Sequence, residues 1–284
     1  MIFSRPAIAA LCATLAAAFP LRAEELIAIR GAQVAAEPVT AAAAEIKKET
    51  GLEFQIVTEG GSAAAVFGIA EDVADVALLS RKMTPQEQAA WPDKAFHEVQ
   101  FGKQALLIVV PSQVWDGGVH TITKDQLRAI YEGRLTNWKT LGGPDRKIVF
   151  YNRDVRTSAW EMLMFFLYED IRKAPPSQAE VLVEPSDVTT AVEFNGGSIS
   201  VLEYAAPKPA ALHALGIRLQ DGIAEPIAKD VATGRYELSR DLIIATARKP
   251  AGKVRRFVDF MLGPAGQAYL NKTGHLSNAD LDAK

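Results

Sequence analysis

The sequence predicts an α/β protein made of two lobes. Short apolar stretches typical of buried strands alternate with stretches typical of helices, which favours mainly parallel sheets flanked by helices. This pattern stops at Pro111, directly after the strong apolar stretch 103–110, and then restarts. A third set of strand and helix signals follows Tyr204. If this tail returns to the first lobe, the chain crosses twice between lobes, and a hinged ligand cleft lies between them.

The first 23 residues have the features of a secretory signal peptide. Arg5 supplies positive charge, residues 7–19 form an apolar run too short to cross a membrane, and residues 21–23 offer a cleavage site before the first acidic residues. The lone cysteine, Cys12, lies inside this segment. We therefore expect a secreted, soluble mature protein without disulfides, thiol chemistry or cysteine-based metal sites.

Charge and hydropathy exclude several classes of function. Residues 1–23 contain two arginines and no acid, so the 31 basic residues of the whole chain fall to 29, against 34 acidic residues. This acidic balance argues against a nucleic-acid partner and against long-range attraction of anions. Any anion site must therefore rely on local donors. No later apolar run reaches 18 residues, so no membrane span is expected.

Residues 24–110 are expected to form the first part of lobe 1. We expect strands at 26–29, 54–57, 73–79 and 103–110. A helix is expected to open at Pro38 and to end before Gly51, because proline favours helix starts and glycine favours helix ends. A second helix is expected to follow the glycine-rich turn 59–65.

Residues 111–204 are expected to form lobe 2, and residues 205–284 are expected to return to lobe 1. Within lobe 2 we expect helices at 123–131, after 158 and at 186–194, and strands at 148–151, 181–184 and 198–204. The returning segment is expected to hold a strand at 236–246 and a helix at 254–262.

The stretch from Lys147 to Tyr168 carries the strongest functional signal. A buried strand leads into a polar loop with two arginines and two hydroxyls, and the loop opens a helix. Helix starts expose unpaired N–H donors and a partial positive charge, so this loop could hold an anion. The alternative is a capped turn with solvated arginines.

Enzyme motifs are missing from the sequence. There is no Gly-x-Ser-x-Gly elbow and no phosphate-binding loop ending in Gly-Lys-Ser/Thr. The four histidines are scattered without the spacing of metal ligands. We therefore expect no catalytic activity, metal or cofactor.

Several ordered blocks of sequence carry a family resemblance. They include Leu127–Trp138 (LRAIYEGRLTNW), Leu141–Gly143 (LGG) and Phe257–Gln267 (FVDFMLGPAGQ). Together with Arg153 and its hydroxyl loop, this series resembles the periplasmic phosphate-binding proteins of ABC importers over essentially the whole mature chain. The resemblance implies a type II periplasmic binding protein fold, in which two lobes close over phosphate and deliver it to a membrane permease. It also implies a periplasmic location. We expect a monomer.

The resemblance implies ligand contacts from four places in this sequence. They are the loop after the first strand with Gln33, the helix start with Ser62, the turn with Ser80 and Arg81, and the loop with Arg153, Thr157 and Ser158. Ser62, Thr157 and Ser158 are also suited to helix capping. Arg81 and Arg156 could be rim charges instead of ligand contacts. Arg240 is expected to be structural and to pair with an acid.

The chain departs from the family pattern at three of these places. Ala32-Gln33-Val34 replaces a loop that usually offers Ser or Thr, although Gln33 can donate through its amide. Ser80 stands where the family often has Asp, and Thr157-Ser158-Ala159 stands where it usually has Ser-Gly-Thr. The oxyanion class is therefore expected more firmly than phosphate itself. The alternatives are another oxyanion or a small organic acid as ligand, or a sensing protein that keeps the fold without transport.

Overall fold

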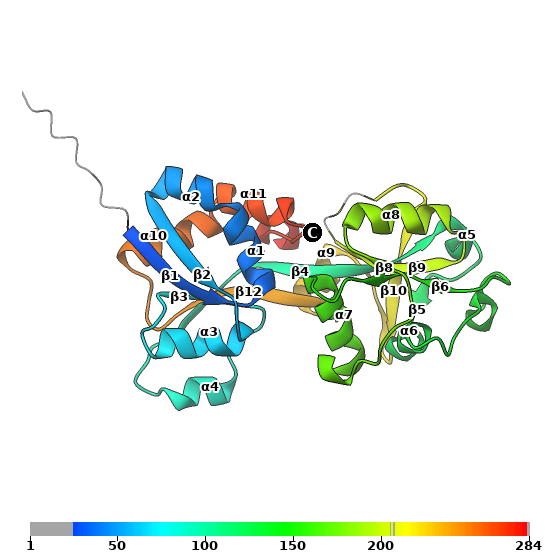
Figure 1. The fold of residues 1–284 in the computed structure, drawn as a ribbon, viewed down its shortest axis with the longest axis horizontal. Coiled ribbons are helices and arrows are strands. Elements are labelled where there is room, and N and C mark those ends of the chain that lie inside the picture. Colours follow the sequence, from blue (N-terminus) through cyan, green and yellow to red (C-terminus); the bar gives the residue numbers. More distant parts are fainter. Residues whose placement is uncertain (1–24, 205, 207, 283–284) are drawn as a thin grey trace, which may run out of the picture.

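A computed structural model describes residues 25–204, 206 and 208–282 of the 284-residue chain. The expected signal peptide over residues 1–23 lies outside the described residues. Among those that are described, no helix is both long and apolar enough to cross a membrane. The chain forms two lobes placed side by side and joined by two strands, β4 and β12 (Figure 1).

The sheet of the first lobe has the strand order β2-β1-β3-β12-β4. Its central strand β1 (Glu25–Gly31) pairs in parallel with β2 (Leu52–Val57) and with β3 (Val76–Leu79). Strand β12 (Ser239–Thr246) then adds to β3 in the antiparallel direction. Because β1 and β3 are parallel, their C-terminal ends lie at the same edge of the sheet. The connection to α1 leaves the end of β1, and Ser80 follows the end of β3.

Helices cover both faces of this first sheet (Figure 1). On one face lie α1 (Gln33–Ala41), α2 (Ala43–Thr50), α10 (Gly252–Leu262) and α11 (Pro264–Lys272), and on the other lie α3 (Gly61–Ala70) and the short α4 (Pro85–Ala90). The two faces enclose separate apolar clusters, one around Ile27 and Phe257 and one around Ile69 and Leu79.

The first helix differs from the sequence expectation. It begins at Gln33, not at Pro38, so Pro38 lies inside the helix. The first helical turn forms directly after β1, because the backbone N–H groups of Ala35 and Ala36 donate to Ala32 O (3.0 and 3.1 Å). Proline has no N–H for the helical ladder. The helix ends at Ala41, within a turn of Pro38, and α2 continues from Ala43.

Strand β4 (His97–Pro111) belongs to both lobes. Its first part, His97–Ala105, pairs with β12 in the first lobe. Its second part pairs with β9 (Ser198–Glu203) and β10 (Leu212–Leu219), which are strands of the second lobe. The hydrogen-bonded pair of β4 and β12 therefore forms the connection between the lobes.

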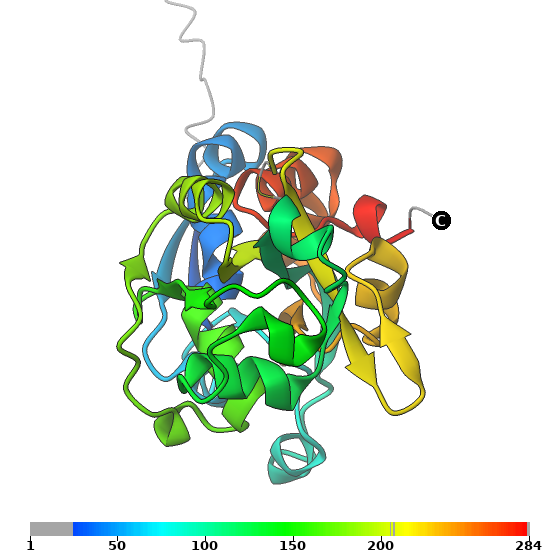
Figure 2. The same cartoon turned by 90° about the vertical axis from the view of Figure 1, so that its right-hand side faces the viewer.

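The second lobe packs its helices around a short mixed sheet, and Figure 2 shows this lobe facing the viewer. Its remaining strands are β5 (Thr121–Ile122), β6 (Val149–Phe150), β7 (Asn152–Arg153), β8 (Val181–Leu182) and β11 (Gly222–Ala224). Its helices are α5 (Ser112–Trp115), α6 (Lys124–Tyr131), α7 (Ser158–Tyr168), α8 (Pro185–Phe194) and α9 (Ala228–Thr233). The short 3-10 helices Trp138–Leu141 and Ile171–Lys173 and the C-terminal helix α12 (Asn278–Asp282) complete the fold. The fully buried Trp138 anchors this core and donates from Nε1 to Gly197 O (2.8 Å).

The α/β architecture in two lobes is confirmed, with two differences in detail. The sheets are mixed because the connecting strands β4 and β12 run antiparallel to their neighbours. The segment after residue 204 also stays in the second lobe, since β10 pairs with β4 at Ile108–Pro111 and with β5. The chain returns to the first lobe only through β12, later than the expected boundary at residue 205.

Candidate functional site

A cleft of about 470 Å³ lies where the two lobes face each other. The first lobe contributes residues from the start of α3 and from the turn after β3, the connecting strand β12 contributes residues from its start, and α7 of the second lobe forms the opposite wall. The lining residues are Ser62, Ala63, Ser80 and Arg81, then Glu237, Ser239 and Arg240, then Glu161, Met162, Phe165 and Phe166. Three of the seven residues predicted to contact ligand, Ser62, Ser80 and Arg81, line this cleft.

Ser62 and Ser80 form a hydroxyl pair on the first-lobe side. Ser62 lies in the first turn of α3, which begins at Gly61. Both Gly61 and the N-cap residue Gly60 have positive φ. The Ser62 Oγ accepts a hydrogen bond from the backbone N–H of Ser80 (3.1 Å) and lies 3.2 Å from the Ser80 Oγ. The predicted alternative, a capping role for Ser62 at α3, is not what the side chain does: it joins the helix start to the end of β3. Both hydroxyls remain half-buried at the cleft.

Arg81 reaches the cleft but is engaged by an acid. Its two terminal nitrogens donate to the two carboxylate oxygens of Glu87 (2.8 and 2.7 Å). This pairing lowers the pKa of Glu87 to about 2, with the hydrogen bond from Arg81 as the main cause. Glu87 also closes the capping box of α4 with Thr84. The pair therefore neutralises the guanidinium at the rim of the cleft.

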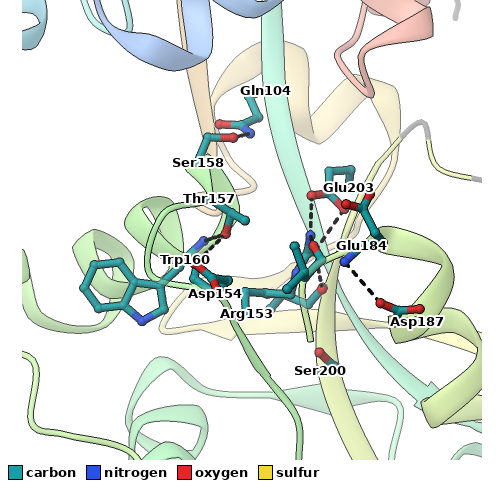
Figure 3. Close-up of polar contacts among 12 residues, drawn as sticks. Gln104, Arg153, Asp154, Thr157, Ser158, Trp160, Glu184, Asp187, Ser200 and Glu203 are labelled. Carbon is teal, nitrogen blue, oxygen red and sulfur yellow. Dashed lines mark hydrogen bonds and ion pairs between the residues drawn. The ribbon is translucent and has the colours of Figure 1, made fainter. Parts of the chain in front are cut away.

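Arg153 is buried and bound to protein groups on nearly all sides (Figure 3). Its side chain is 1% exposed and forms a bidentate ion pair with Glu203, both N···O distances being 3.0 Å. The same two nitrogens also donate to the carbonyls of Val201 and Val183 (3.2 Å each). A guanidinium has five N–H groups, so four are used and only the buried Nε has no partner in the described part of the chain. The ligand contact expected of Arg153 stays a prediction.

The loop after Arg153 shapes the start of α7. Thr157 is the N-cap: its Oγ1 accepts from the Trp160 N–H (3.2 Å) and donates to Asp154 O (2.7 Å). Ser158 Oγ accepts from Gln104 Nε2 (2.9 Å), a contact visible in Figure 3. Neither residue lines the cleft, and Arg156 forms an exposed pair with Asp154 (2.8 Å). The predicted capping role of Thr157 is confirmed.

Gln33 lies in a separate position. It is the first residue of α1, and its side chain is exposed. It is not among the residues that line the cleft. Gln33, Thr157 and Ser158 therefore stay predicted ligand contacts, and the structure does not bring them to the same surface as Ser62 and Ser80.

Arg240 is a cleft residue that sequence reasoning assigned to a structural role. It lies on β12 opposite Gln104 of β4, and its Nε donates to Gln104 Oε1 (2.9 Å). Its Nη2 lies 3.4 Å from Ser158 O and 3.5 Å from Glu161 Oε2. It thus pairs with an acid, as expected, but at the long limit of a hydrogen bond. The available signal was a single arginine at the polar beginning of the otherwise apolar strand Ser239–Thr246.

Two titratable groups with shifted pKa values, Glu37 and His275, interact electrostatically with Arg240. Burial raises the pKa of Glu37 to about 7, which Arg240 opposes and Glu203 and Glu161 reinforce. Burial lowers the pKa of His275 to about 4, and its Nε2 lies 3.7 Å from Glu37 Oε2. Within the described ranges, no group of three or more His, Cys, Asp or Glu side chains is arranged to hold a metal ion.

Two α/β lobes joined by a pair of strands, with a cleft between them that is polar on one side and apolar on the other, define a solute-binding protein of the two-lobed class. The chain belongs to the PBP superfamily, because the family model described as "PBP superfamily domain" matches residues 20–265. This confirms the resemblance seen in the sequence.

Relatives and solved structures agree with this assignment. The chain is similar to the phosphate-binding protein PstS of Borreliella burgdorferi, with 27% identity over 76% of this chain and 77% of that protein. It is also similar to PstS of Bacillus subtilis, with 28% identity over 80% of this chain and 72% of that protein. Its fold is that of an ABC-type phosphate transport receptor from Vibrio cholerae (TM-score 0.68, 23% identity, 88% of this chain and 99% of that chain). The crystal structure of PstS from Borrelia burgdorferi is similar to the same degree (TM-score 0.69, 24% identity, 89% of this chain and 99% of that chain).

Proposed function

We propose that this protein is a periplasmic solute-binding protein that captures an oxyanion, with inorganic phosphate as the leading ligand, and delivers it to the permease of an ABC importer. One observation carries the proposal: the hydroxyl pair Ser62–Ser80 and the guanidinium of Arg240 all line the same cleft between the two lobes. The names of the curated relatives, phosphate-binding proteins, support phosphate as the leading ligand.

The polar groups are sufficient in number for useful affinity. Micromolar binding requires about 8 kcal/mol, and a hydrogen bond to a charged group contributes about 1.5–3 kcal/mol. Two hydroxyls, a guanidinium and backbone N–H groups at the start of α3 therefore supply enough, after the cost of ordering and desolvation is subtracted. The proposal needs no catalysis, because capture and release by lobe closure involve no bond chemistry.

A second candidate ligand is a small organic anion. The wall of the cleft formed by α7 is apolar, with Met162, Phe165 and Phe166 among its lining residues, and Phe165 is 61% exposed. Inorganic phosphate has no apolar group to cover this wall. An anion with a hydrocarbon part would place its charged group near Arg240 and its apolar part on α7.

Isothermal titration calorimetry on protein stripped of ligand tests both candidates. The panel contains phosphate, sulfate and small organic acids, together with phenyl phosphate as an anion that carries a ring. We expect phosphate to bind with micromolar affinity. Absence of phosphate binding below millimolar concentration would remove phosphate as the ligand, and a sub-millimolar organic anion would then identify the second candidate.

A receptor without a transport role is the remaining alternative. It has the same fold and the same ligand, so binding data do not separate it from a transport protein. A permease gene beside the gene for this chain supports transport, and loss of phosphate uptake on its deletion tests that role directly.

A further inference from the structure

We propose that Arg240 is the guanidinium that binds the anion in the cleft, and that Arg153 acts as a structural strut with Glu203. This inference rests on the proposed function, and it assigns the charged contact to the strand that connects the lobes instead of to the loop before α7.

The contacts of Arg153 leave it little capacity for a ligand. Its two terminal nitrogens already hold both oxygens of Glu203 and two backbone carbonyls. An anion could reach them only by displacing Glu203, whose carboxylate would then lie unpaired beside the anion. An unpaired charge in a buried position is strongly unfavourable. The Arg153–Glu203 pair is also neutral as a unit, so it adds no net positive charge to the cleft.

Arg240 has the opposite properties. It lines the cleft, and its neighbours there come from both lobes. Gln104 fixes the guanidinium through Nε, and the Nε2 of Gln104 in turn bonds Ser158 at the start of α7. Within the described residues, Nη1 makes no hydrogen bond and Nη2 makes only two long ones. The guanidinium is therefore held in place through Nε, while its terminal nitrogens have only weak hydrogen-bond partners.

The charge of Arg240 is incompletely compensated. The side chain is 15% exposed, and burial lowers its pKa from the ordinary value, while Glu161 and Glu37 act to raise it. The raised pKa of Glu37, about 7, also means that this carboxyl is partly protonated at neutral pH. A bound oxyanion would supply the missing negative charge, and charge-assisted bonds from arginine to such groups are short and strong.

Glu161 lies where the anion is expected to bind and competes with it for Arg240. Its carboxylate lies 3.5 Å from Arg240 Nη2, on the cleft wall, and its side chain is 48% exposed. A carboxylate oxygen near a guanidinium occupies the kind of place that a phosphate oxygen takes. Since Glu161 can turn into solvent, an anion can replace it without leaving a buried charge behind. Glu161 should therefore weaken anion binding.

The test is calorimetric titration with inorganic phosphate of the stripped mature protein and its variants. We expect Arg240→Gln to weaken phosphate binding by at least about tenfold, the loss of one or more charge-assisted bonds. Arg240→Lys keeps the charge but loses the planar fork and the bond to Gln104, so its affinity should lie between those of Arg240→Gln and the unmodified protein. Arg255→Gln is the matched control, because Arg255 forms an exposed pair with Asp259 on α10.

Two further variants decide the assignment without touching Arg240. Arg153→Met combined with Glu203→Met removes the strut as a pair, and we expect its phosphate affinity to stay within about threefold of the unmodified protein. Glu161→Gln removes the competitor and should tighten binding by about two- to fivefold. These variants keep the test decisive if Arg240→Gln does not fold.

The outcomes separate this inference from the proposed function. If the unmodified protein binds no anion of the panel, the proposed function fails and the inference with it. If it binds phosphate and folded Arg240→Gln binds equally well, the inference alone is overturned. The inference is also overturned if the folded Arg153→Met, Glu203→Met double variant no longer binds phosphate and Glu161→Gln does not increase the phosphate affinity.

Discussion

Arg153 and Glu203 face each other as a bidentate ion pair that joins β7 to the end of β9 (Figure 3). The arginine is 1% exposed and the glutamate side chain 15% exposed. Removal of one partner of such a buried pair leaves an uncompensated charge. We expect Glu203→Ala to lower the free energy of unfolding by about 3–5 kcal/mol, measured by urea denaturation.

The double variant in which both residues become methionine is the control for this prediction. It removes both charges together, so its loss of stability should be clearly smaller than that of Glu203→Ala. Equal losses in the two proteins would show that packing, and not the unpaired charge, accounts for the effect.

Glu37 gives a pH dependence with a definite sign. Burial raises its pKa to about 7 from an ordinary value of 4.5. Between these values the folded protein holds the proton more tightly than the unfolded chain does, so this group lowers stability as pH rises from about 4.5 to about 7. Glu37→Gln imitates the protonated form. The melting temperature of the variant minus that of the unmodified protein should be more positive at pH 8 than at pH 4.5.

His275 acts in the opposite direction and must be separated from Glu37. Its pKa falls to about 4 from 6.5, so its contribution makes stability rise with pH across that window. This contribution is present in both proteins and largely cancels in the difference. A difference in melting temperature that does not change between pH 4.5 and pH 8 would contradict the raised pKa of Glu37.

Ser62 is expected to contact the anion and can be tested without a large effect on folding. We expect Ser62→Ala to weaken phosphate binding by about 10- to 100-fold, the equivalent of one hydrogen bond to a charged group of about 1.5–3 kcal/mol. The comparison by calorimetry with Ser112→Ala controls for loss of a hydroxyl, since Ser112 bonds Ala211 and His213 in the second lobe away from the cleft. Equal affinities for Ser62→Ala and the control would exclude Ser62 from the site.

Gly31 lies at the end of β1, where the strand passes close to Leu78 of β3. A Cβ at this position would lie 2.6 Å from Leu78 Cβ and 2.9 Å from Leu78 O, too close for either atom. The next residue, Ala32, bonds that same carbonyl. We expect Gly31→Ala to lower the free energy of unfolding by about 1–3 kcal/mol, the usual cost of overpacking. Chemical denaturation measures this, and an unchanged midpoint would show that β1 and β3 can move apart freely.

The sequence alone was sufficient to predict the lobes and the family. Alternating strand and helix patterns, together with blocks such as Phe257–Gln267, depend on local composition and order, and the PBP superfamily match confirms them. Local patterns also placed the first strand correctly, at Leu26–Ile29 within β1. The helix after it was misplaced because Pro38 is usual at helix starts but also occurs inside helices.

The roles of the two arginines could not be predicted in the same way. Arg153 meets Glu203 across 50 residues of sequence, and Arg240 approaches Ser158 across 82. In the sequence, an arginine that binds a ligand looks the same as one that binds a buried carboxylate, because both appear as an arginine at the end of a strand. Only the three-dimensional partners distinguish them. The same holds for the segment that follows residue 204, whose place in the second lobe depends on pairing between β10 and β4.

A crystal structure of the protein grown with arsenate tests most directly whether Arg240 and the Ser62–Ser80 pair bind the anion. Arsenate is a tetrahedral oxyanion whose arsenic can be located by anomalous scattering. We predict one anomalous peak in the cleft, with anion oxygens within hydrogen-bond distance of Arg240 and of the Ser62–Ser80 pair, and with the Arg153–Glu203 pair intact. A peak bonded to Arg153 with Glu203 displaced, or a cleft without arsenate at saturating concentration, would contradict it.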